Sequence, residues 1–280
     1  MNDLNEFPFR LAAIDLDGTL LGPDKKISSA NTEAVRRLRD AGVQVMIASG
    51  RRHQNSLRFH QELHLNGPII ACQGGLIRNG ETGEILYARF LPEQIADQLA
   101  GEGDSLGLDV IYYHLEHLYV GARHSRWLDL YGARVGEKPD LLPDLHLLAG
   151  KEALKIVWYA EPSKLAILRA EMTARYAGRC DVLSTEMENL EFMPIGVNKA
   201  TALARIADEL QIKPEAVLAF GDGENDVAML RWAGLGVAMS NGNAVAKAAA
   251  KLVPPEGPAE SDFARAVEAV FQRARNGNAA

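Results

Sequence analysis

Short apolar runs alternate with longer amphipathic stretches in the first part of this chain. The apolar runs at residues 11–14, 43–48 and 68–72 have the length and composition of strands buried in a parallel sheet. The stretch between the first two runs has helical spacing, and Ser28 or Ser29 can cap its start. Such alternation of strand and helix is typical of βαβ units. The pattern therefore predicts a parallel sheet at the start of the chain.

The pattern changes over residues 85–190, where strands and helices follow one another without the regular βαβ order. Strand-like runs lie at residues 108–113, 118–120, 154–159 and 180–183, and helix-like runs at 92–106, 125–131 and 162–176. From Glu191 onward the alternation returns, with a further apolar strand at 217–220. We therefore predict an α/β fold with a Rossmann-like parallel-sheet core at 1–85 and 189–280, split by an inserted α+β domain at 86–188.

Two carboxylates stand where the first strand should end. Asp15 and Asp17 follow the apolar run 11–14, and Gly18 lets the chain turn away sharply. In open α/β sheets, ligands bind in the crevice beyond the carboxyl ends of the strands. Unpaired carboxylates at such a place are costly unless a cation or a reaction requires them. The pair therefore indicates a functional site.

Polar groups follow two further strands and open one helix. Ser49 and Gly50 come directly after the run 43–48, and Lys199 opens a helix-like stretch at 199–210. The strand at 217–220 is followed by three polar side chains in a short loop, Asp222, Asn225 and Asp226. Because the ends of parallel strands meet at one edge of a sheet, we expect these groups to converge.

This ordered set resembles the haloacid dehalogenase superfamily, whose members are mostly magnesium-dependent phosphatases. The order is Asp-x-Asp-Gly-Thr, then Ser, then Lys, then Gly-Asp-x-x-Asn-Asp. The split layout resembles the Cof-type branch, which carries a mixed α/β cap between the second and third catalytic motifs. Two loops depart from that pattern. Gln73-Gly74-Gly75 stands where members often have Asn-Gly-Ala, and residues 238–244 stretch a loop that is usually Ala-Met-Gly-Asn-Ala.

The resemblance implies a covalent mechanism. Asp15 is the expected nucleophile, which forms an aspartyl-phosphate. Asp17 is the expected general acid, which protonates the leaving alkoxide and then acts as a base on the hydrolytic water. The phosphoryl oxygens would be bound by the hydroxyl of Ser49, the ammonium of Lys199, the amide of Asn225 and the main-chain N–H groups of Gly50 and Leu16.

A phosphate monoester is anionic, so an attacking carboxylate is repelled unless a cation intervenes. Mg²⁺ suits carboxylate ligands together with retained waters. Asp15 and Asp222 can supply carboxylates from neighbouring strand ends. By the family pattern, the backbone carbonyl of Asp17 supplies a further ligand, and Asp226 completes or braces the metal shell.

The composition of the chain excludes several classes of protein and of binding partner. Of the 280 residues, 47% are hydrophobic and 24% charged, which argues against wholesale disorder. The net charge of −7 disfavours nucleic-acid binding, and no apolar run approaches the roughly 20 residues of a membrane span. Residues 1–6 lack the features of a signal peptide, and the two cysteines suggest no disulfide framework. We therefore expect a cytoplasmic protein, either a monomer or a weak homodimer, without nucleic-acid or membrane partners.

The histidines do not indicate a second metal site. None of the seven shows zinc-ligand spacing. His53, His60 and His64 are predicted to lie on the surface of a helix.

Three other functions remain open at this point. A sugar phosphomutase or phosphotransferase would share the aspartyl-phosphate. A dehalogenase would leave Asp17 and the acidic cluster unexplained. A non-enzymatic receiver domain also combines paired acids, Ser or Thr, and Lys, but it is much shorter and has no inserted domain. An insertion that acts as a lid over the strand ends would exclude water and admit a small phosphate ester, such as a sugar phosphate.

Overall fold

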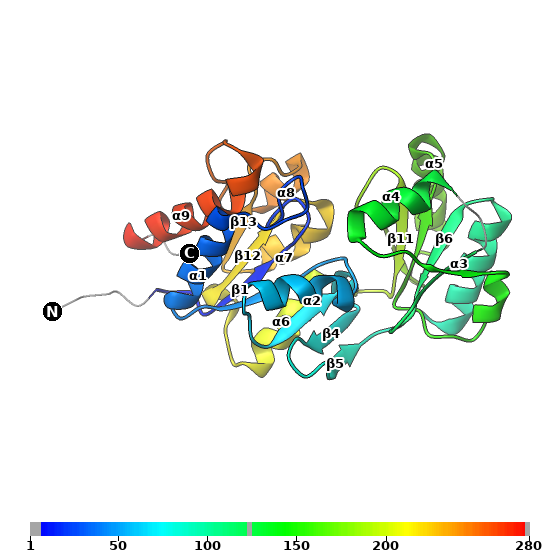
Figure 1. The fold of residues 1–280 in the computed structure, drawn as a ribbon, viewed down its shortest axis with the longest axis horizontal. Coiled ribbons are helices and arrows are strands. Elements are labelled where there is room, and N and C mark those ends of the chain that lie inside the picture. Colours follow the sequence, from blue (N-terminus) through cyan, green and yellow to red (C-terminus); the bar gives the residue numbers. More distant parts are fainter. Residues whose placement is uncertain (1–6, 122–124, 278–280) are drawn as a thin grey trace. The chain divides into compact units, whose positions relative to one another are not determined.

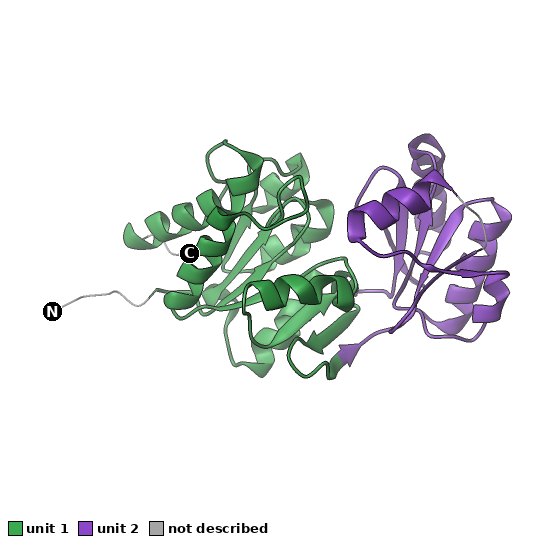
Figure 2. Cartoon of the chain, viewed as in Figure 1, with its two compact units in different colours: residues 1–86, 198–280 green, residues 87–197 purple. Residues whose placement is uncertain are grey.

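The computed structural model describes residues 7–121 and 125–277, so the segment 1–6 used in the signal-peptide expectation lies outside the described residues. The chain divides into two compact units, as Figure 2 shows. The first unit comprises Met1–Leu86 and Asn198–Ala280, and the second comprises Tyr87–Val197. The second unit is therefore an insertion within the first, as the sequence pattern predicted.

The first unit is built on a four-stranded parallel sheet with the strand order β13-β12-β1-β2 (Figure 1). The strands are β1 (Leu11–Ile14), β2 (Gln44–Ile47), β12 (Val217–Gly221) and β13 (Leu235–Ala238). Every residue of β1 is buried, which explains why its sequence is continuously apolar rather than alternating. A small sheet of β3 (Pro68–Ala71), β4 (Leu76–Asn79) and β5 (Ile85–Ala88) follows β2 in the chain.

Helices cover this sheet. They are α1 (Ser29–Asp40), α2 (His53–Glu62), α6 (Lys199–Glu209), α7 (Val227–Trp232), α8 (Ala244–Ala249) and α9 (Asp262–Arg275). The hydroxyl of Ser28 caps α1 by accepting from the N–H of Asn31 at 3.2 Å. The main core lies between the sheet and helices α1 and α9, where the rings of Phe220 and Phe263 meet edge to face.

The second unit is an α+β domain on a six-stranded sheet with the order β10-β11-β9-β6-β7-β8. Its strands are β6 (Asp109–Tyr113), β7 (Leu118–Gly121), β8 (Asp140–Leu142), β9 (Lys155–Tyr159), β10 (Asp181–Leu183) and β11 (Asn189–Met193). Its helices are α3 (Glu93–Ser105), α4 (Arg126–Val135) and α5 (Pro162–Arg175). Its own core includes Trp158 and Phe192, so each unit buries a separate apolar cluster.

Two sequence predictions need correction. The strand β11 pairs with β9 in the second unit, so residues 189–197 do not belong to the core as the predicted boundary at 188 implied. The sequence of β11 alternates polar and apolar residues, which is typical of an antiparallel strand and not of the continuously apolar strands of the core. His53 and His60 are buried rather than exposed, because one side of α2 packs inward.

No helix in the part of the chain that the structure describes has both the length and the apolar character needed to cross a membrane.

A buried ion pair joins two strands of the second unit. The ammonium of Lys155 lies 2.7 Å from Glu191 Oε2, and both side chains are almost fully buried. The hydroxyl of Thr185 donates to the other oxygen of Glu191 at 2.8 Å. Removing only the cation would leave the carboxylate charged and buried.

We therefore expect Lys155→Met to destabilise the protein by about 3–5 kcal/mol, as for other broken buried pairs. The double variant Lys155→Met/Glu191→Met should recover most of this loss, because no charge is then left buried. Urea denaturation followed by tryptophan fluorescence would measure both. Equal losses in the single and the double variant would show that packing, not the uncompensated charge, is responsible.

Candidate active site

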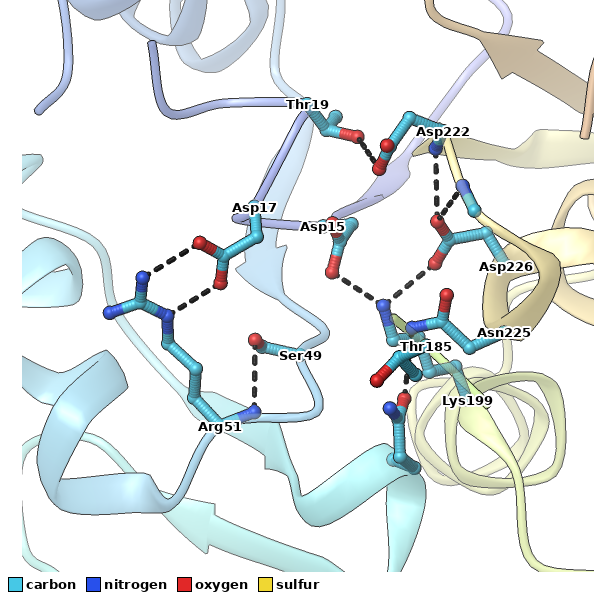
Figure 3. Close-up of polar contacts among 12 residues, drawn as sticks. Asp15, Asp17, Thr19, Ser49, Arg51, Thr185, Lys199, Asp222, Asn225 and Asp226 are labelled. Carbon is cyan, nitrogen blue, oxygen red and sulfur yellow. Dashed lines mark hydrogen bonds and ion pairs between the residues drawn. The ribbon is translucent and has the colours of Figure 1, made fainter. Parts of the chain in front are cut away.

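Three carboxylates converge at the carboxyl ends of β1 and β12. These strands pair in register, with Ile14 opposite Phe220, so the residues that follow them emerge side by side. One ligand oxygen from each of Asp15, Asp222 and Asp226 lies within 4.8 Å of the others. Asp15 and Asp226 are buried and Asp222 is partly buried. Figure 3 shows Asp15 at the centre of this arrangement.

Lys199 links two of these acids. Its ammonium donates to Asp15 Oδ1 at 2.5 Å and to Asp226 Oδ1 at 2.7 Å, and only 1% of the residue is exposed. Burial alone would lower the pKa of Lys199, but the two carboxylates raise it above its usual value. Lys199 is the first residue of α6, and a capping box between Asn198 and Thr201 fixes that helix start.

The cluster still has an excess of negative charge. Burial raises the pKa of Asp15 well above its usual value; Lys199 opposes this shift, and Asp226 and Asp222 add to it. Burial and the nearby Asp226 raise the pKa of Asp222 to about 7. Carboxylates that resist ionisation together are stabilised by a cation among them. Their oxygen atoms are the ligands that Mg²⁺ prefers, so these residues fit a magnesium ion.

Asp226 is braced by its own loop. Its Oδ2 accepts from the main-chain N–H groups of Asp222 at 2.9 Å and of Gly223 at 3.0 Å. The hydroxyl of Thr19 donates to Asp222 Oδ1 at 3.2 Å. These bonds orient the acidic loop after β12 against the turn after β1.

Asp17 lies apart from the acidic cluster. Its carboxylate accepts two hydrogen bonds from Arg51, at 2.6 and 2.7 Å (Figure 3). It accepts a third from Lys25 at 2.8 Å. Burial would raise the pKa of Asp17, but Arg51 and Lys25 lower it to about 2. In this arrangement Asp17 is therefore an ionised acceptor, whereas its predicted role as a general acid requires a proton.

The predicted phosphate-binding residues occupy the same edge of the sheet. The hydroxyl of Ser49, which is 1% exposed, accepts from the N–H of Arg51 at 3.2 Å. The amide of Asn225 donates to Gln73 Oε1 at 3.1 Å. The side chain of Leu16 is buried in the core, so only its main chain can serve the site. Gly50 is closely packed, since a Cβ there would lie 2.4 Å from Gln73 Nε2.

Sequence reasoning missed Lys25, Arg51 and Gln73. Arg51 directly follows Ser49-Gly50 in the chain, and this position was a usable signal. Gln73 stood out only as a departure from Asn-Gly-Ala. Nothing in the sequence distinguished Lys25 from a solvated surface lysine.

Three comparisons with known proteins show what this chain is similar to. A family model described as haloacid dehalogenase-like hydrolase matches residues 12–257. The 5-amino-6-(5-phospho-D-ribitylamino)uracil phosphatase of Bacillus subtilis is 29% identical over 236 residues, which cover 83% of this chain and 87% of that protein. The HMP-PP phosphatase of Cronobacter sakazakii is 30% identical over 232 residues, which cover 83% of this chain and 84% of that protein.

A solved structure has a similar fold over most of this chain. The crystal structure of a haloacid dehalogenase-like hydrolase from Bacteroides thetaiotaomicron has a TM-score of 0.84 and 28% identity, covering 94% of this chain and 100% of that chain. The predicted fold class, an α/β parallel-sheet core with an inserted α+β domain, is confirmed.

Gly18 offers a test of the acidic cluster. It has a φ of +80°, and a Cβ there would lie 2.3 Å from Asp222 Oδ2. We expect Gly18→Ala to displace that carboxylate and to weaken Mg²⁺ binding at least tenfold in a calorimetric titration. Gly42→Ala is the matched control, because Gly42 has a φ of +82° and nothing lies within 4 Å of its added Cβ. Both changes carry the same left-handed backbone strain. Equal Mg²⁺ affinities in the two variants would argue against Asp222 as a ligand.

Proposed function

Because the chain belongs to the haloacid dehalogenase-like hydrolase family, we propose that it is a Mg²⁺-dependent phosphatase that hydrolyses small phosphomonoesters through an aspartyl-phosphate. The observation that supports this most is the buried Asp15 carboxylate, which Lys199 holds beside Asp222 and Asp226 at the end of β1. A carboxylate placed in this way can attack phosphorus, and its neighbours can hold the cation that such an attack needs.

The first step forms a bond between a carboxylate oxygen of Asp15 and phosphorus, and breaks the bond between phosphorus and the ester oxygen. Asp17 gives its proton to the departing alkoxide. In the second step, Asp17 takes a proton from water, and this water cleaves the aspartyl-phosphate to free phosphate. Mg²⁺, when bound by Asp15, Asp222, Asp226 and the Asp17 carbonyl, supplies positive charge that offsets the repulsion between carboxylate and phosphate.

The ion pairs of Asp17 set a condition on this mechanism. While Arg51 and Lys25 bind the carboxylate, they hold its pKa at about 2 and it carries no proton. The acid role therefore requires that these cations release Asp17 once substrate is present. The arriving phosphate dianion is a competing partner for both cations.

The remaining groups position and neutralise the phosphoryl oxygens. The Lys199 ammonium provides charge, and the Ser49 hydroxyl and the Asn225 amide provide hydrogen bonds. The main-chain N–H groups of Leu16 and Gly50 complete this set. In phosphoryl transfer most of the catalysis comes from such positioning and electrostatic stabilisation.

The substrate that we propose is a small phosphorylated metabolite. One of the relatives is named for 5-amino-6-(5-phospho-D-ribitylamino)uracil and another for HMP-PP. The net charge of −7 disfavours a polyanionic partner such as a nucleic acid.

The proposed function is tested by phosphate release from a panel of sugar phosphates, nucleotides and a nitrophenyl phosphate in the presence of Mg²⁺. We expect turnover of at least one ester, and a loss of more than a thousandfold in Asp15→Asn, because the amide is a poor nucleophile. Asp24→Asn, an exposed change in the same loop region, should keep full activity. Activity of Asp15→Asn within tenfold of the natural protein would refute the nucleophile. Phosphoryl transfer to a sugar without release of phosphate would favour the mutase.

Asp17→Asn should affect poor leaving groups more than good ones, because Asp17 is assigned to protonate the departing oxygen. We expect the loss of kcat/KM to be at least tenfold larger for an alkyl phosphate than for nitrophenyl phosphate. Steady-state kinetics on the two esters would measure this difference. Equal losses on both would remove the acid role from Asp17.

A further inference from the structure

The segment after β3 adopts an unusual backbone conformation. Cys72 has a φ of +48° and Gln73 a φ of +57°, and Gly74 follows with +101°. Gly and Asn adopt the left-handed region of backbone conformation readily, whereas for Cys and Gln this conformation is energetically unfavourable. Both side chains are also buried, at 0% and 3% exposed. Consecutive strained residues persist where the surroundings determine their conformation, and they are found preferentially at functional sites.

The backbone of this segment is bonded to the loop after β2. The N–H of Cys72 donates to the carbonyl of Arg51 at 2.8 Å, and the N–H of Gln73 donates to the carbonyl of Ser49 at 3.0 Å. On its other side the segment packs against the start of α6, because a Cβ on Gly74 would lie 2.4 Å from the carbonyl oxygen of Asn198. The segment therefore touches two pieces of the site, namely the Ser49 loop and the helix start that presents Lys199.

The side chain of Gln73 reaches a third piece. Its Oε1 accepts from Asn225 Nδ2 at 3.1 Å, and its Nε2 lies so close to Gly50 that no Cβ fits between them. The amide of Gln73 thus joins the loop that follows β2, at Gly50, to the loop that follows β12, at Asn225. Gly50 and Asn225 are two of the groups assigned above to the phosphoryl oxygens.

We propose that Gln73 is a positioning residue that holds Asn225 against Gly50 in the arrangement that binds the phosphoryl group. This inference rests on the proposed function. The side chain of Gln is one methylene longer than that of Asn, and this length lets its amide extend from a left-handed backbone position to Asn225. The strained backbone conformation is retained because it directs the side-chain amide of Gln73 toward Asn225.

Gln73→Asn separates this role from a purely structural one. Asn tolerates a positive φ better than Gln, so the variant should be no less stable to heat than the natural protein. Its shorter side chain should nevertheless lose Asn225. We expect the dissociation constant of inorganic phosphate, measured by calorimetry with Mg²⁺, to rise about tenfold. The value of kcat/KM for nitrophenyl phosphate should fall by a similar factor.

A control variant and a double variant complete this test. Gln211→Asn is the matched control, because Gln211 has a φ of +56° and lies exposed after α6, so it should leave phosphate binding and turnover unchanged. If Gln73 acts through Asn225, then Gln73→Asn should add little further loss in an Asn225→Ala background, since the two effects are then not additive.

The outcomes distinguish the inference from the proposed function. Unchanged phosphate affinity in Gln73→Asn, or full additivity with Asn225→Ala, would overturn the positioning role. A parallel loss of thermal stability and activity would assign Gln73 to folding alone, and would also overturn it. Failure of the natural protein to turn over any ester would instead count against the proposed function, while the phosphate titrations would still report on Gln73.

Discussion

The site depends on one buried ammonium group shared between two acids. Lys199 lies between Asp15 and Asp226 and contacts both at hydrogen-bond distance. Without this cation the buried carboxylates would repel one another, and ionising them would be very unfavourable. With it, Asp15 has a fixed orientation, and Asp226 is held where it can also accept two main-chain hydrogen bonds from the loop after β12.

The same charge balance divides the site into two parts. On one side, the acidic cluster keeps an excess of negative charge, which raises the pKa values of Asp15 and Asp222 and suits a divalent cation. On the other side, Arg51 and Lys25 surround Asp17 and lower its pKa. A phosphate ester needs positive charge around its oxygens and an attacking carboxylate beside a metal. In the proposed mechanism, the acidic cluster would hold the metal beside Asp15, and the cations at Asp17 would face the phosphate.

Parallel pairing explains how distant segments build this arrangement. The register of β1 with β12 and of β1 with β2 brings three strand ends to one edge of the sheet, so short loops are enough to deliver the functional groups. The strained segment Cys72–Gly74 then ties the loop after β2 to the start of α6 and to Asn225. The placement of the groups proposed to bind phosphate thus depends on the packing of loops as well as on the strands.

The sequence by itself determined the α/β core and the insertion, and it identified the acidic residues as candidates for a site. Continuous apolar runs and the residues that end them are local signals. Only the tertiary structure decided that β11 joins the inserted sheet, where it pairs antiparallel with β9. It also decided that Arg51 and Lys25 pair with Asp17 and that Gln73 reaches Asn225. Which side chains become partners depends on how loops from different strands pack together, and the spacing of residues along the chain does not encode this.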